Sequence, residues 1–131
     1  VAIGANCGVG ASELVATVLG ISAARPDATV VAKGNCGIPQ YVDGHIHYTG
    51  TPQLMADYAR IALDAGARII GGCCGTSPEH LAAMRESLET YTRGQRPTVD
   101  LIEQRLGPVS ELAKGVDTAA AGAAKRERRR G

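Results

Sequence analysis

The sequence is poor in aromatic residues and has no long apolar run. Its 131 residues include four tyrosines but no phenylalanine and no tryptophan. No apolar run approaches the roughly 20 residues that a membrane-spanning helix needs, and no basic segment with an apolar core opens the chain as a signal peptide would. We therefore expect a cytoplasmic protein that does not enter a membrane. Hydrophobic residues at 44% and charged residues at 21% exclude a fully disordered chain.

The charge is nearly balanced overall but unevenly distributed. The formal net charge is +1, yet most of the residues from 125 to 131 are Lys or Arg, which leaves the rest of the chain acidic. A short basic tail after an Ala/Gly stretch is usually a solvated chain end. An acidic body gives no footprint for nucleic acid, so we expect no nucleic-acid partner.

Residues 1 to 90 alternate short apolar runs with helical patterns. The alternation predicts three strands, each followed by a helix, and hence parallel pairing through right-handed crossovers. A long glycine-rich loop is expected between the second strand and the second helix, over residues 34–50. The expected strands are residues 1–4, 29–32 and 67–70, and the expected helices begin at the N-cap residues Ser12, Thr51 and Ser77.

Three parallel strands cannot close a barrel. The chain is therefore either a small open α/β domain or the last part of a (β/α) barrel, and the start at Val1, inside an apolar run, favours the partial barrel. We expect residues 1–98 to form this barrel portion, and residues 99–131 to form a short helix and a mobile basic tail. A partial barrel exposes strand edges, so the isolated piece is expected to self-associate or to be inactive.

All four cysteines follow a predicted strand. Cys7 follows the first, Cys36 the second, and Cys73 and Cys74 the third, and a glycine comes directly after each group. The carboxyl ends of parallel strands meet at one edge of a sheet, where active sites of such folds are built. The sequence therefore predicts a cluster of thiols at that edge.

Three interpretations of the cluster compete. Buried structural cysteines would not explain why all four share one edge. A disulfide is disfavoured because no secretion signal is present and a bond between adjacent cysteines is strained. Thiolate ligation of Zn²⁺ fits best, with three protein thiolates and one exchangeable position. Spacing alone does not distinguish this open site from a closed structural site that uses all four cysteines.

Two short motifs carry a family resemblance. The segment from Gly71 to His80, Gly-Gly-Cys-Cys-Gly-Thr-Ser-Pro-Glu-His, resembles the signature of the zinc-dependent homocysteine S-methyltransferases, and residues 5–8 resemble that family's upstream cysteine motif. Residues 33–50 are most similar to bacterial betaine–homocysteine methyltransferases. The resemblance covers about residues 1–98 and implies the last three βα units of a (β/α)₈ barrel.

The resemblance implies a zinc site and a reaction. Cys7, Cys73 and Cys74 would bind Zn²⁺, which would activate the thiol of homocysteine for attack on a small methyl donor and so form methionine. Glycine betaine is the favoured donor, with S-methylmethionine or a folate–cobalamin relay as alternatives. The full-length protein is expected to form a homo-oligomer.

Other residues receive less specific roles. Asn6, Gly72 and Tyr48 are expected to contact the substrate. Cys36 stands where the family usually has a small residue such as Ala, so we expect a near-site thiol that does not bind the metal. The competing hypothesis makes Cys36 the fourth ligand of a closed zinc module without catalysis. His80, early in the third helix, is expected to be structural or exposed.

Overall fold

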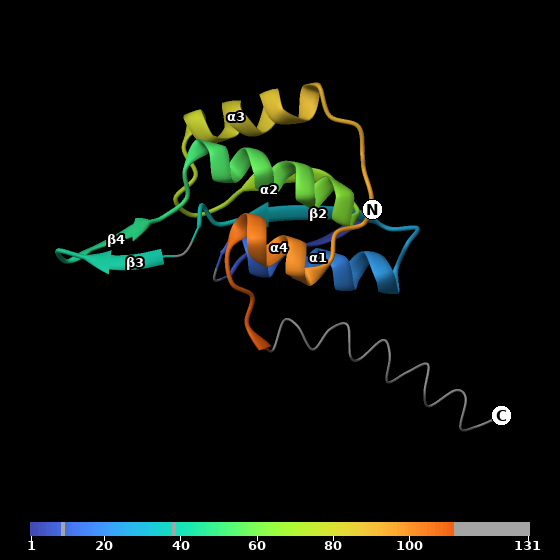
Figure 1. The fold of residues 1–131 in the computed structure, drawn as a ribbon, viewed down its shortest axis with the longest axis horizontal. Helices are drawn as coiled ribbons and strands as arrows, with labels where there is room; N and C mark the ends of the chain where they lie inside the picture. The colour runs from blue at the N-terminus through green and yellow to red at the C-terminus, as the bar shows by residue number, and fades with distance from the viewer. Residues whose placement is uncertain (9, 38, 112–131) are drawn as a thin grey trace.

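The structure is a computed structural model of the chain and describes residues 1–8, 10–37 and 39–111. Its centre is a three-stranded parallel sheet in the order β1-β2-β5, flanked by helices (Figure 1). The predicted α/β architecture with parallel pairing is confirmed, and the sheet of the described residues does not close into a barrel. The elements of this body are β1 (Ala2–Cys7), α1 (Ala11–Ala24), β2 (Thr29–Gly34), α2 (Pro52–Ala65), β5 (Ala67–Gly72), α3 (Pro78–Glu89) and α4 (Val99–Leu106).

The ends of α2 follow directly from the sequence. The hydroxyl of Thr51 accepts a hydrogen bond from the backbone N–H of Leu54 at 3.1 Å, and Pro52 occupies the first turn. Gly66 ends the helix at φ 115°, a left-handed conformation that glycine adopts without a steric penalty. The predicted start and end of this helix are both confirmed.

The start of α1 differs from the prediction. Its N-cap is Gly10, and Ser12 lies inside the first turn, where its side chain is buried. The hydroxyl of Ser12 donates to the backbone carbonyl of Pro108 at 2.9 Å instead of capping its own helix. The Ser12 hydroxyl, which the local sequence pattern predicts as the helix cap, therefore makes a tertiary contact with the segment after α4.

The expected loop over residues 34–50 contains a β-hairpin. Strands β3 (Pro39–Val42) and β4 (His45–Tyr48) pair in antiparallel register and project from the body (Figure 1). Asp43 and Gly44 turn the chain with φ of 50° and 80°, and two positive φ values in a two-residue turn match the twist of a hairpin. The prediction of an irregular loop was therefore wrong. The dipeptide Asp-Gly is itself typical of a hairpin turn, so the sequence did contain a signal for this hairpin.

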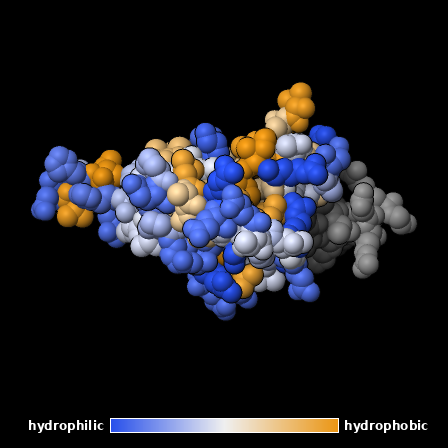
Figure 2. All heavy atoms as spheres, turned by 90° about the horizontal axis from the view of Figure 1, so that it is seen from above, coloured by the Kyte–Doolittle hydropathy of each residue, from blue (hydrophilic) through white to orange (hydrophobic). Residues whose placement is uncertain are grey.

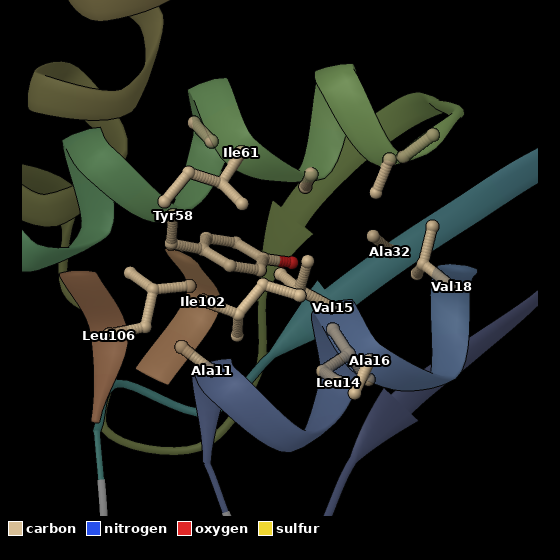
Figure 3. Packing of buried hydrophobic residues seen from close by; sticks show 14 of the residues in the cluster. Ala11, Leu14, Val15, Ala16, Val18, Ala32, Tyr58, Ile61, Ile102 and Leu106 are labelled. Atoms are coloured by element: carbon tan, nitrogen blue, oxygen red, sulfur yellow. The ribbon is translucent and has the colours of Figure 1, made fainter. Parts of the chain in front are cut away.

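The hydrophobic core lies between the sheet and the helices. The side chains of Val30 and Ala32 from β2 meet apolar residues of α1 and α2, and α4 closes the cluster with Ile102. Figure 3 shows the ring of Tyr58 pointing from α2 into this cluster, with Ile102 and Val15 close by. Tyr58 is completely buried and is the largest of the fully buried side chains in the described chain.

The other face of the sheet has no helix of the described chain over it. Strand side chains alternate between faces, so every second residue points away from the core. We call this surface the open face. Its residues are exposed or half-buried, and they are Ala2, Gly4, Asn6, Val31, Lys33, Ile69 and Gly71.

Exposed apolar side chains also occur on the hairpin. Val42 and Ile46 are 45% and 63% exposed, and Figure 2 shows apolar residues among polar ones at the hairpin end of the molecule. Among the described helices, none combines the length and the apolar character needed to cross a membrane. The basic tail predicted over the last residues lies outside the described part of the chain.

We predict that Tyr58→Phe destabilises the protein by about 1–3 kcal/mol. The hydroxyl accepts from the backbone N–H of Gly34 at 3.0 Å and donates to the carbonyl of Gly71 at 3.2 Å, so its loss removes a partner from one buried and one part-buried backbone group. Urea denaturation measures the free energy of unfolding. Tyr41→Phe, at a site 77% exposed, is the matched control and should leave it unchanged. Equal stability of the two variants would contradict the role of Tyr58.

Candidate metal centre

Three sulfur atoms converge at the carboxyl edge of the sheet. Cys7 ends β1, and Cys73 and Cys74 follow β5, which lies on the other side of β2. The Sγ atoms of Cys7 and Cys74 are 3.7 Å apart, and those of Cys73 and Cys74 are 3.9 Å apart. All three sulfurs lie within 4.8 Å of one another. The arrangement brings together three of the four thiols that the sequence placed at this edge.

The sulfur spacing suits a tetrahedral metal ion. Bonds of about 2.3 Å from zinc to sulfur, at the tetrahedral angle, place neighbouring sulfurs about 3.8 Å apart. The separations of 3.7 Å between Cys7 and Cys74 and 3.9 Å between Cys73 and Cys74 bracket this value. A disulfide needs sulfurs about 2.05 Å apart, and all four cysteines are free. The three thiols could therefore hold a metal ion and leave a fourth position for another ligand.

The backbone bends sharply to direct the Cys7 side chain. Cys7 has φ 64° and Gly8 has φ 82°, so two consecutive residues are left-handed. A left-handed conformation is uncommon for a residue other than glycine and occurs often at functional sites. The turn therefore aims this thiol across the end of β2 toward the other two sulfurs.

The pKa values of two of the three thiols are shifted in opposite directions. Hydrogen bonds from Cys74 and then Cys73, with a smaller contribution from the backbone at Gly8, lower the pKa of the Cys7 thiol. The same hydrogen bond with Cys7, followed by that with Cys73, raises the pKa of Cys74. Of these two thiols, Cys7 is therefore the more readily deprotonated, because neighbouring thiols stabilise its thiolate.

Asn35 holds the two cysteine turns together. Its side-chain amide donates to the carbonyl of Gly8 at 2.6 Å, and its amide oxygen accepts from the N–H of Cys74 at 3.1 Å. The residue is 2% exposed, and the backbone N–H of Cys36 adds a bond to the carbonyl of Cys74 at 2.9 Å. Sequence reasoning gave Asn35 no role, although the repeated Asn-Cys-Gly at residues 6–8 and 35–37 marked the position.

The fourth cysteine points elsewhere. The thiol of Cys36 is fully buried and donates to the carbonyl of Gly50 at 3.1 Å, and it does not belong to the group of three close sulfurs. Burial raises its pKa, so it stays a neutral thiol. His80 hydrogen-bonds the same carbonyl through Nε2 at 3.1 Å and caps α3 with Ser77, which is a structural role.

The residues expected to contact the substrate lie at different distances from the thiols. Tyr48, at the end of β4, packs against Gly75, and burial and a hydrogen bond with Cys74 raise its pKa. Gly72 packs so closely on Thr76 that any side chain there would collide with it. Asn6 is exposed on the open face, beside Lys33 in the adjacent strand. Tyr48 is thus the one of these side chains that touches the cluster.

The fold and the cluster together define an α/β protein with three thiols at the carboxyl edge of a parallel sheet that could hold a metal ion. The family model for homocysteine S-methyltransferase matches residues 1–88 of the chain. The chain belongs to this family, whose members are methyltransferases that act on homocysteine. All three clustered cysteines lie inside the matched region.

We predict that Asn35→Ala weakens zinc binding by about 10- to 100-fold, since residues that orient metal ligands have effects of this size. The variant loses both bonds that hold Gly8 and Cys74 in place. Competition with a chromophoric chelator measures the affinity. Asn6→Ala is the matched control, because this asparagine belongs to the same kind of motif but is exposed, whereas Asn35 is buried. Equal affinities for the two variants would exclude the proposed role of Asn35.

Proposed function

We propose that this chain carries the zinc and thiol-activating part of a homocysteine S-methyltransferase that uses glycine betaine as methyl donor. The observation that supports it most strongly is the sulfur spacing of 3.7 and 3.9 Å in a chain of this family. In this proposal Cys7, Cys73 and Cys74 are the ligands of Zn²⁺. The small-molecule partners are homocysteine and the donor.

Bound zinc would lower the pKa of the homocysteine thiol, so that it is a thiolate at neutral pH. Each of the three cysteines gives up its proton to ligate, and their three negative charges exceed the charge of the ion by one. This excess keeps electron density on sulfur and therefore keeps the substrate thiolate reactive. The exposure of Cys74 leaves room on its side of the cluster for an incoming substrate.

The transfer itself needs no general base. The thiolate sulfur of homocysteine forms a bond to a methyl carbon of the donor, and the carbon–nitrogen bond breaks with its electron pair going to nitrogen. The products are methionine and dimethylglycine, and no proton moves in this step. The contribution of the chain is to position the two reactants and to keep the sulfur deprotonated.

The choice of betaine rests on Tyr48 and on the resemblance of residues 33–50. The tyrosine lies beside Cys74, within reach of any group that approaches the clustered sulfurs. An aromatic face attracts a quaternary ammonium through the cation–π interaction. S-methylmethionine is also cationic, so comparing initial rates with the two donors tests this part of the proposal.

The open face supports the partial-barrel hypothesis. In a (β/α)₈ barrel, helices cover the outside and the opposite face of each strand lines the interior. Here α1 and α2 pack on one face, while β1 and β5 each have one edge without a partner strand in the described chain. We propose that further βα units complete the barrel at these two edges. The homo-oligomer expected of the full-length protein also stays a prediction.

We predict that Cys7→Ser or Cys73→Ser in the zinc-loaded enzyme removes most bound zinc and lowers kcat by at least 100-fold. An alcohol ligates zinc far more weakly than a thiolate because it is not deprotonated at neutral pH. Metal content by mass spectrometry and methionine formation are the two measurements. Retention of full activity without metal would refute the proposed function.

The proposed enzyme site and the closed four-cysteine module make opposite predictions for the variant Cys36→Ala. We expect Cys36→Ala to retain one zinc per chain and most of the activity, because Gly50 keeps its bond to His80 and no ligand is lost. The cavity should lower the free energy of unfolding by about 1 kcal/mol. Loss of zinc together with the fold would establish the structural module instead.

A further inference from the structure

A single cation stands on the open face. Lys33 is the only lysine in residues 1–113, and its side chain extends from the central strand β2, on the side away from the helices. Its neighbours in register are Asn6 on β1 and Gly71 on β5. The glycine leaves room for the lysine, because a Cβ there would lie 3.8 Å from Cγ and 3.9 Å from Cε of Lys33.

This cation lacks a counter-charge in the described chain. The ion pairs among residues 1–8, 10–37 and 39–111 are Arg25–Asp27 and Arg85–Glu89, both far from the open face in the sequence. The other residues of the open face are uncharged. Lys33 is exposed in the described chain, but in the barrel proposed above this face lines the interior. Enclosing an unpaired ammonium group there would be costly, so the lysine would require an anion.

The anion has a natural source at this position. The register partners of Lys33 are Asn6 on β1 and Gly71 on β5. Cys7 comes one residue after Asn6, and Cys73 comes two residues after Gly71. At about 3.3 Å per residue, the cysteine turns lie roughly 3–7 Å farther along the strands than Lys33. The carboxylate of homocysteine is four bonds from its sulfur, a span of about 5 Å. A homocysteine whose sulfur lies at the thiols therefore has its carboxylate within reach of the Lys33 side chain.

We propose that Lys33 binds the carboxylate of a substrate whose reacting atom lies at the three thiols. The inference rests on the proposed function and adds a specificity residue to it. Both substrates carry such a carboxylate, four bonds from sulfur in homocysteine and three bonds from the reacting methyl carbon in glycine betaine. The shared chemistry is an α-amino or α-ammonio carboxylate, and the experiment separates the two sources.

The test compares Lys33→Met and Lys33→Arg in the complete, zinc-loaded enzyme. The Kd of homocysteine is measured by titration calorimetry, and the KM of glycine betaine is measured from initial rates. The methionine variant should raise one of these constants about 10- to 100-fold, the loss expected for a hydrogen bond between charged groups, and the arginine variant should restore most of it. The constant that rises identifies which carboxylate Lys33 binds.

Two controls separate charge recognition from a structural effect. The analogue 3-aminopropane-1-thiol is homocysteine without its carboxylate, and it should bind the wild type and Lys33→Met equally if homocysteine is the partner of Lys33. Arg68→Met removes an exposed cation from the opposite end of the same sheet and should change neither constant.

Three outcomes would count against one or both proposals. Unchanged constants in Lys33→Met would show that another part of the protein supplies the counter-charge, while the proposed function stands. A loss of zinc in that variant would show that Lys33 balances the charge of the thiolates rather than that of a substrate. A wild-type enzyme that loads zinc but binds no homocysteine would refute the proposed function and this inference together.

Discussion

The cluster of three thiols depends on a bridge across the end of β2. Cys7 and the adjacent pair at the end of β5 belong to strands separated by two strand spacings, about 9.6 Å. Their sulfurs nevertheless lie within 4.8 Å of one another. The buried amide of Asn35 spans this gap with one donor and one acceptor, and both partners are backbone groups of the cysteine turns. A short side chain next to the end of the central strand thus holds together the turns that carry the thiols at the ends of the two neighbouring strands.

The base of the hairpin is tied to the same region. The carbonyl of Gly50 receives hydrogen bonds from the buried thiol of Cys36 and from the ring of His80. Tyr48, two residues earlier, lies against Gly75 and Cys74. The base is therefore fixed to the sheet edge and to α3, whereas the side chains of Val42 and Ile46 near the tip remain exposed. This division keeps an aromatic ring beside the thiols whatever the outer part of the hairpin contacts.

Elements with complete local signals could be predicted from the sequence. Thr51, Pro52 and Gly66 each specify a backbone conformation or a hydrogen bond within one turn of α2, so its limits needed no tertiary information. The cysteines were placed at one edge because parallel strands leave no other arrangement of their carboxyl ends. Ser12 was misassigned because its hydroxyl bonds Pro108, 96 residues away in the sequence. Asn35 was missed for the same reason, since its two partners lie in the turns that follow two other strands, β1 and β5.

The scarcity of large side chains has a consequence for the open face. Six of its seven residues are uncharged, and Ala2, Gly4 and Gly71 are the smallest that a strand can hold. Small residues leave free volume in front of a sheet, and here that volume adjoins the three thiols. Bulky apolar residues at these three positions would fill the free volume and leave no room for a small molecule. Lys33 is long, but its stem lies over Gly71 rather than across the space. The same face that cannot form a core by itself is therefore suited to admit a small charged molecule to the sulfur atoms.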